Sequence, residues 1–178
     1  MIALSLPLKR IVDLDLALCR YCNRQSLQSV WIRDGFRIIS RLGDGVFWYG
    51  LMGLLLLIYR AQAIPAVCQM LLTATVGVLV YKLIKQKTLR PRPCDVYPSI
   101  VCTGRALDQF SFPSGHTLHA VSFSIIAWAH FPQLAWCLLP FVLLVALSRP
   151  ILGLHYPSDV LAGGILGATL AHSSLALL

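Results

Sequence analysis

The sequence predicts an all-α fold: a polytopic transmembrane helix bundle of about five spans, preceded by interfacial amphipathic helices at the N-terminus. Apolar residues make up 57% of the 178-residue chain and charged residues only 12%, whereas charged residues make up about 25% of a typical soluble domain. Several stretches also approach the roughly 20 apolar residues that a helix needs to cross a bilayer. These observations together indicate a membrane protein with one compact domain.

Residues 46–178 are predicted to form the transmembrane domain. The first span is short and must tilt or include the preceding glycine-rich turn, whereas the second is uncharged and long enough. Residues 85–115 are rich in polar residues and proline, so we expect a loop there. Pro132 divides the following apolar stretch into two helices. The expected spans are 46–59, 61–81, 117–131, 133–147 and 160–178.

Two residue types suggest how these helices are placed. Trp48, Trp128 and Trp136 fall near expected span ends, where tryptophan commonly anchors a helix at the membrane interface. Gly163 and Gly167 are four residues apart in the last span, a spacing that favours close helix packing.

Residues 1–45 mix apolar side chains with seven Lys and Arg residues, and no stretch among them is long enough to span. This pattern predicts one or two amphipathic helices lying on the membrane surface. The alternative is a cytosolic helical cap on the bundle.

Three short segments carry the residue types that suggest chemistry, and each lies at an expected span boundary. Because each expected span carries the chain to the other side of the membrane, the order of the spans places all three segments on one face. Polar residues scattered at random would not be expected to fall on the same face. Their residues are Lys85, Arg92 and Pro93; then Pro113, Ser114, Gly115 and His116; then Ser148, Arg149, His155 and Asp159.

In order and spacing, these segments resemble the three-part signature of the type-2 phosphatidic acid phosphatase superfamily. That signature is Lys, six residues, Arg-Pro; Pro-Ser-Gly-His; and Ser-Arg, five residues, His, three residues, Asp. The match has no departure at any signature position and covers about 75 residues, from 85 to 159. The resemblance implies a helical fold that hydrolyses phosphate esters through a phosphohistidine.

Phosphoryl transfer depends mainly on positioning and on stabilising negative charge. Arg92 and Arg149 offer planar forks for phosphate oxygens, and Lys85 adds a compact positive charge. If Pro113 begins a helix, the amides of Ser114 and Gly115 lie at its positive end and form an anion cradle with the Ser114 hydroxyl.

The two histidines of the signature suit the two chemical roles that remain. Asp159 follows His155 by one helical turn and can accept the N–H of one ring nitrogen, leaving the other nitrogen as the nucleophile. His116 then protonates the leaving lipid oxygen and later activates water. The family resemblance assigns these same three roles.

The composition favours a reaction without metal or cofactor. All seven acidic residues are Asp, so few ligands exist for a carboxylate-rich metal site, and the basic residues supply positive charge instead. Cys19 and Cys22 stand alone as a pair, without the second pair that a zinc site requires. The net charge of +8 fits an anionic lipid partner better than nucleic acid in so apolar a chain.

We therefore expect an integral-membrane lipid phosphatase. By resemblance the first choice of substrate is undecaprenyl or another polyprenyl diphosphate, followed by phosphatidylglycerophosphate, phosphatidic acid and lipid A phosphate. A haloperoxidase of the superfamily, which would hold vanadate, is disfavoured because those proteins are larger and soluble. The remaining alternative is a non-catalytic lipid-binding scaffold or transporter. The sequence indicates no particular oligomeric state.

The distribution of charge predicts the membrane face. Fourteen of the 15 Lys and Arg residues fall on the face that carries the signature, and only Arg60 falls on the other. The positive-inside rule then places the N-terminus and the site in the cytoplasm, with the protein in a bacterial inner membrane. A periplasmic site is the alternative.

Overall fold

The computed structural model describes residues 6–177, and these residues form helices and connecting segments without a strand. Residues 1–5 of the predicted interfacial segment, and Leu178, lie outside the described residues. In chain order the elements are α1 (Leu6–Gln28), α2 (Val30–Arg41), the π-helical turn η1 (Leu42–Val46), α3 (Phe47–Tyr59), the 3₁₀ turn η2 (Arg60–Ala63), α4 (Ile64–Thr88), α5 (Pro93–Val96), α6 (Gly115–His130), the 3₁₀ turn η3 (Pro132–Leu134), α7 (Ala135–Ile151) and α8 (Pro157–Ala176).

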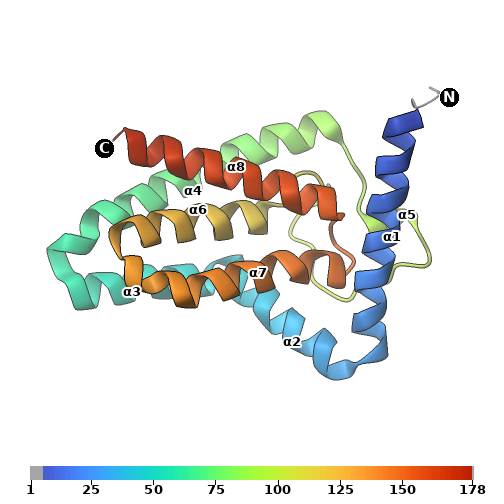
Figure 1. Ribbon diagram of the computed structural model, residues 1–178, viewed down its shortest axis with the longest axis horizontal. Helices are drawn as coiled ribbons and strands as arrows, with labels where there is room; N and C mark the ends of the chain where they lie inside the picture. Colours follow the sequence, from blue (N-terminus) through green and yellow to red (C-terminus); the bar gives the residue numbers. More distant parts are fainter. Residues whose placement is uncertain (1–5, 178) are drawn as a thin grey trace.

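The five helices α3, α4, α6, α7 and α8 lie side by side along the long axis, and α1 crosses one end of this bundle (Figure 1). Helix α6 contacts α4, α7 and α8, so it occupies the centre. The connections α3–α4 and α6–α7 and the end of α8 lie at one end. The opposite end holds the end of α4, the start of α6, the end of α7 and the start of α8 (Figure 1). We call this second end the site end.

Two helices extend further than the sequence predicted. Helix α4 continues to Thr88, so Lys85 lies in a helix and not in the predicted loop. Polar residues alone do not end a helix, and α4 stops only at Leu89, which adopts φ 48° shortly before Pro91. Helix α7 likewise runs to Ile151, just before Gly153 turns the chain with φ 77°.

The starts of α6 and α8 follow local sequence signals. Ser114 caps α6 by accepting a hydrogen bond from the amide of Thr117. Pro113, which follows a cis peptide bond from Phe112, therefore lies one residue before the cap. We had expected it to begin the helix. Pro157 occupies the first turn of α8, a position that suits proline.

The N-terminal segment contains two helices, α1 and α2, and both contact α7. The boundary that we predicted after residue 45 falls inside η1, which joins α2 directly to α3. The N-terminal helices are thus packed on the bundle, and their place on the membrane surface stays a prediction.

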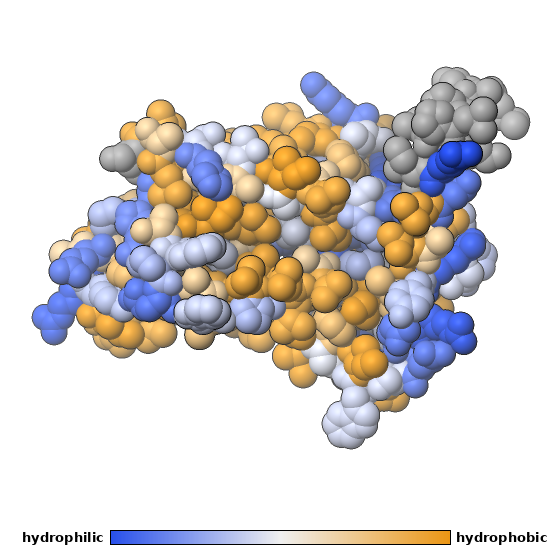
Figure 2. All heavy atoms as spheres, viewed as in Figure 1, coloured by the Kyte–Doolittle hydropathy of each residue, from blue (hydrophilic) through white to orange (hydrophobic). Residues whose placement is uncertain are grey.

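Apolar side chains cover much of the flank of the bundle, and hydrophilic residues gather towards its ends (Figure 2). Two helical stretches of the described chain, Val30–Val96 and Pro132–Ile151, are long and apolar enough to cross a membrane, and only 39% of the apolar window in each is buried. These two stretches do not separate the five predicted spans from one another, so the number of spans stays a prediction. We expected Trp48 to lie at the membrane interface, and this was wrong. Its side chain is only 1% exposed and packs in the core against Phe47, Phe123 and Phe141.

Helices α6 and α8 approach each other closely at two glycines, as their spacing predicted. A Cβ atom on Gly163 would lie 2.4 Å from the carbonyl oxygen of Ser114, and one on Gly167 would lie 2.3 Å from that of Leu118. The close approach also lets the Ser114 amide donate to the carbonyl of Asp159 at 3.0 Å. The glycines therefore fix the start of α6 against the start of α8.

We expect Gly163→Ala and Gly167→Ala each to destabilise the protein by about 1–3 kcal/mol, because the added methyl group must push two backbones apart. The measurement is the thermal unfolding midpoint in detergent. Gly164→Ala is the matched control, since its Cβ would meet only methyl groups of Thr117 and Val121 at 3.9 Å. Equal midpoints for all three variants would contradict the close-packing argument.

Candidate functional site

The site end of the bundle contains a cavity of about 240 Å³. It is lined by residues from η1, α3, α4, α6 and α7, from the two segments that flank α5, and from the segment between α7 and α8. Six of the eight predicted site residues line this cavity: Lys85, Arg92, Gly115, His116, Arg149 and His155. The structure thus brings together residues from three distant segments, as the count of crossings predicted.

His155 lies in the short segment between α7 and α8 and is 2% exposed. Its Nδ1 is 2.6 Å from the carbonyl oxygen of Ser111. A carbonyl only accepts, so Nδ1 must carry the hydrogen, and Nε2 keeps the lone pair. Burial, followed by the charges of Arg149 and Arg92, lowers the pKa of His155 well below its usual value. The imidazole is therefore neutral near pH 7, which a nucleophile requires.

Asp159 does not accept the hydrogen bond from His155 that we expected. Its Oδ2 lies 3.7 Å from Nδ1 of His155, because that oxygen accepts from the amide of Tyr156 at 2.9 Å in the capping box of α8. Its Oδ1 accepts from Arg90 at 2.6 Å. Asp159 thus holds the backbone beside His155, and Ser111 provides the direct contact.

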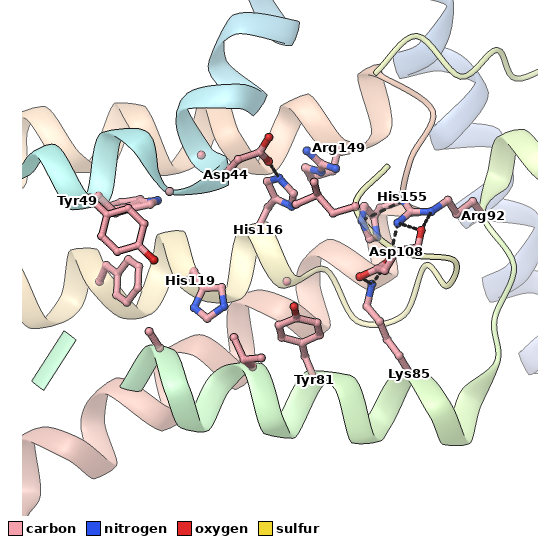
Figure 3. A pocket seen from close by; sticks show the side chains of 18 residues that line it. Asp44, Tyr49, Tyr81, Lys85, Arg92, Asp108, His116, His119, Arg149 and His155 are labelled. Carbon is pink, nitrogen blue, oxygen red and sulfur yellow. Dashed lines mark hydrogen bonds and ion pairs between the residues drawn. The ribbon is translucent and has the colours of Figure 1, made fainter. Parts of the chain in front are cut away.

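The three predicted phosphate-binding cations are all nearly buried. Lys85 is 5% exposed, Arg92 3% and Arg149 1%. Arg92 donates to the carbonyl of Leu154 at 2.8 Å, and its Nη1 lies 3.5 Å from Nε2 of His155. Arg149 donates to the Ser40 hydroxyl at 2.6 Å, whereas its buried Nε has no hydrogen-bond partner. These groups place positive charge around the free nitrogen of His155 (Figure 3).

Asp108, which sequence reasoning missed, lies between two of these cations (Figure 3). Both carboxylate oxygens accept from Lys85 Nζ at 2.8 Å, and Oδ1 accepts from Arg92 Nη2 at 2.7 Å. Burial opposes its ionisation, but the hydrogen bond and charge of Lys85 and the charge of Arg92 outweigh burial and lower the pKa of Asp108. The carboxylate therefore occupies the position that a phosphate would need to reach the same donors.

Asp44 is the second functional residue that the sequence did not reveal. Its carboxylate Oδ1 contacts Nε2 of His116, and it comes from η1, 72 residues away along the chain. Figure 3 shows His116 with Asp44 on one side and His155 on the other. A carboxylate on one ring nitrogen fixes the orientation of the imidazole. The chain has only seven acidic residues, and the one signal available for Asp44 was its position directly before the first expected span.

Ser114 and Gly115 differ in how they relate to the cavity. Gly115 lines it at the start of α6. Ser114 is fully buried, its amide donates to Asp159, and its hydroxyl lies 3.0 Å from that of Thr117. The anion cradle is thus reduced to the first-turn amides at Gly115 and His116, and phosphate binding by Ser114 stays a prediction.

Arg90, which lies just after α4, ties α1 to the site. Its guanidinium contacts Asp15 of α1 at 2.7 Å and Asp159 at 2.6 Å, and it lies 4.0 Å from the ring centroid of Tyr156. Asp15 also accepts from the amide and hydroxyl of Ser158. This network supports the start of α8 from outside the cavity.

The cavity is also lined by apolar and aromatic side chains, including Trp48, Val78, Tyr81 and Phe123. His119 also lines it and stacks on Phe123 at 5.4 Å between ring centroids. One cavity thus joins a cationic end to an apolar end (Figure 3). Within the described residues, no cluster of three or more His, Cys, Asp or Glu has metal-ligand geometry.

Comparisons with known proteins agree with this arrangement. A decaprenylphosphoryl-5-phosphoribose phosphatase from Mycobacterium tuberculosis is 36% identical over 122 residues, which cover 65% of this chain and 66% of that protein. An undecaprenyl-diphosphatase from Sulfolobus acidocaldarius is 27% identical over 139 residues, covering 77% of this chain and 66% of that one. The matches thus span just under two thirds of the length of these relatives.

A solved structure shares the fold. The transmembrane PAP2-type phosphatidylglycerolphosphate phosphatase from Bacillus subtilis superposes with a TM-score of 0.73 at 25% identity, covering 94% of this chain and 86% of that one. The model of the PAP2 superfamily matches residues 66–177, which is more than half of the chain and includes the whole signature. The family that the signature resembled is therefore confirmed: this chain belongs to the PAP2 superfamily.

Proposed function

We propose that this chain is an integral-membrane phosphatase that removes a phosphate group from a lipid phosphate or diphosphate. The observation that carries the proposal is the buried, neutral His155, whose Nε2 keeps its lone pair beside a cavity with three nearly buried cations. Such a cavity stabilises the charge of a transferring phosphoryl group. The apolar end of the same cavity suits the lipid part of the substrate.

The reaction proceeds in two displacements. Nε2 of His155 attacks phosphorus, the N–P bond forms, and the bond from phosphorus to the lipid oxygen breaks as His116 donates a proton to that oxygen. His116 then takes a proton from water as the water oxygen attacks phosphorus, the N–P bond breaks, and inorganic phosphate leaves with neutral His155 restored. Lys85, Arg92 and Arg149 bind the phosphoryl oxygens throughout, and Asp159 holds the segment that carries His155.

The proposed first-choice substrate is a polyprenyl diphosphate such as undecaprenyl diphosphate. Support comes from two relatives whose names include a polyprenyl group, one from Sulfolobus acidocaldarius and one from Mycobacterium tuberculosis. Phosphatidylglycerophosphate, the substrate in the name of the Bacillus subtilis structure, is the next choice, ahead of phosphatidic acid and lipid A phosphate.

We further propose that α3, α4, α6, α7 and α8 cross a bacterial inner membrane and that the site end faces the cytoplasm. The exposed apolar flank of the bundle supports the crossings. Fourteen of the 15 Lys and Arg residues belong to the site end and its N-terminal helices, and the positive-inside rule supports the cytoplasmic face.

His155→Ala should lower turnover by roughly 10³-fold or more, because the variant lacks the nucleophile. The measurement is phosphate release from polyprenyl diphosphate in detergent with EDTA present, since the proposed reaction uses no divalent cation. An acid-labile, base-stable phosphoenzyme should form in the wild type alone. Thermal unfolding shows whether the variant is folded. Full turnover by His155→Ala, or loss of wild-type turnover in EDTA that a divalent ion restores, would reject the mechanism.

Asp108→Asn should strengthen binding of inorganic phosphate several-fold, because Lys85 and Arg92 lose the carboxylate that competes with phosphate for them. The rise in unfolding temperature with phosphate concentration measures this affinity. Asp95→Asn, which also removes one negative charge from the segment between α4 and α6, is the control. Weaker phosphate binding in Asp108→Asn would mean that Asp108 positions the cations and does not compete.

A membrane-impermeant thiol reagent should not label Cys102 in intact cells, because Cys102 is exposed at the site end and the proposal places that end in the cytoplasm. The test uses a chain with Cys102 as its one cysteine. The matched chain instead carries Gln62→Cys in η2, at the opposite end, and should be labelled. The reverse pattern would place the site in the periplasm and leave the phosphatase proposal standing.

A further inference from the structure

A second cavity of about 320 Å³ lies beside the first at the site end. Three arginines line it: Arg37 and Arg41 from α2, and Arg105 from the segment between α5 and α6. Asp44 is the one carboxylate among the lining residues, and its Oδ1 contacts His116. The lining therefore carries three formal positive charges against one negative charge.

The two cavities adjoin at a wall made of two side-chain pairs. Asp44 lines both cavities and contacts His116. Arg149 lines the first cavity and donates to Ser40, which lines the second. The wall therefore contains His116, the proposed proton donor to the leaving group. The second cavity therefore begins one side chain, Asp44, beyond His116.

The arginines around the second cavity have N–H donors that are not used in hydrogen bonds within the described residues. Arg37 is held by the carbonyl of Thr103 and by Asp34, which orders one side of the cavity. Arg41 and Arg105 are exposed, and in the described part of the chain neither guanidinium group donates a hydrogen bond to another protein group. The buried Nε of Arg149, in the wall, also lacks a partner. A buried donor without an acceptor costs about 1–3 kcal/mol, and an anion beside it relieves that cost.

We propose that the second cavity is an anion subsite for a second phosphate of the same substrate, the one that stays with the lipid. Arginine forks favour phosphate oxygens, and the polar lining does not suit an acyl or prenyl chain. The inference rests on the proposed function and deepens it. Substrates with a second phosphate, such as a lipid diphosphate or a phosphodiester-linked phosphate, gain contacts that phosphatidic acid lacks.

The test compares two soluble probes, methylenediphosphonate, which carries two linked phosphonates, and inorganic phosphate. Each is titrated against the unfolding temperature, which needs no turnover. The double variant Arg41→Gln/Arg105→Gln should bind methylenediphosphonate roughly tenfold more weakly, the loss expected for about one charge-assisted hydrogen bond. Its affinity for inorganic phosphate should change less than about twofold, because the first cavity is intact.

Arg10→Gln/Arg24→Gln is the matched control, since it removes two exposed charges of α1 at the same end of the bundle. It should leave both affinities unchanged. A second readout is the ratio of kcat/KM for polyprenyl diphosphate to that for phosphatidic acid, which should fall in the Arg41/Arg105 variant alone.

Equal loss for both probes and both substrates would overturn the subsite, because it would show a general attraction of anions or of the anionic bilayer surface. Unchanged affinities would overturn it as well. Neither result would touch the proposed function, which fails only if the wild type releases no phosphate from any lipid or if His155→Ala keeps full turnover.

Discussion

Three nearly buried cations at one end of an apolar bundle are the constraint on which the rest of the structure depends. Burying an ammonium or guanidinium group costs several kcal/mol unless acceptors replace the lost water. The carboxylate of Asp108 and the carbonyls of Asp108, Phe110 and Leu154 accept from Lys85 and Arg92. Arg149, by contrast, donates to Ser40 and has an unpartnered Nε. The fold therefore keeps positive charge in excess at this end, and an anion entering the cavity would meet Arg149 and the donors that Asp108 now occupies.

Helix packing keeps these charges in place, although it occurs mostly outside the cavity. Gly163 and Gly167 bring α6 and α8 close enough for the backbone at Ser114 to bond to that at Asp159. The side chain of Asp159 is in turn held by Arg90, which also binds α1. A displacement of α8 or α1 would thus move the histidines relative to each other, so the N-terminal helices belong to the same mechanical unit as the bundle.

The helical fold and the gathering of the signature residues could be predicted from sequence, because apolar stretches and span counting require only local information. Lys85 was placed in a loop since composition does not show that a helix continues past the apolar region. Trp48 was assigned to an interface because burial depends on which helices pack against it. Asp44 and Asp108 were missed for a related reason: each meets its partner through a turn or loop whose path no local pattern defines, and Asp108 lies 23 residues from Lys85.

The shape of the charge distribution also limits the kind of ligand that fits. A small soluble phosphate ester would satisfy the cations but would leave the apolar part of the cavity, near Tyr81 and Phe123, exposed to water. A lipid without an ionised headgroup would fill the apolar part of the cavity but would leave the cations without an anionic partner. An amphipathic phosphate fills both parts, and Asp108 makes the cationic part selective, since only a group more highly charged than a carboxylate displaces it readily from two cations. A doubly ionised phosphate meets that condition, whereas a phosphodiester or a fatty acid carries a single charge. The site therefore favours terminal phosphates over the phosphodiesters that surround it in a bilayer.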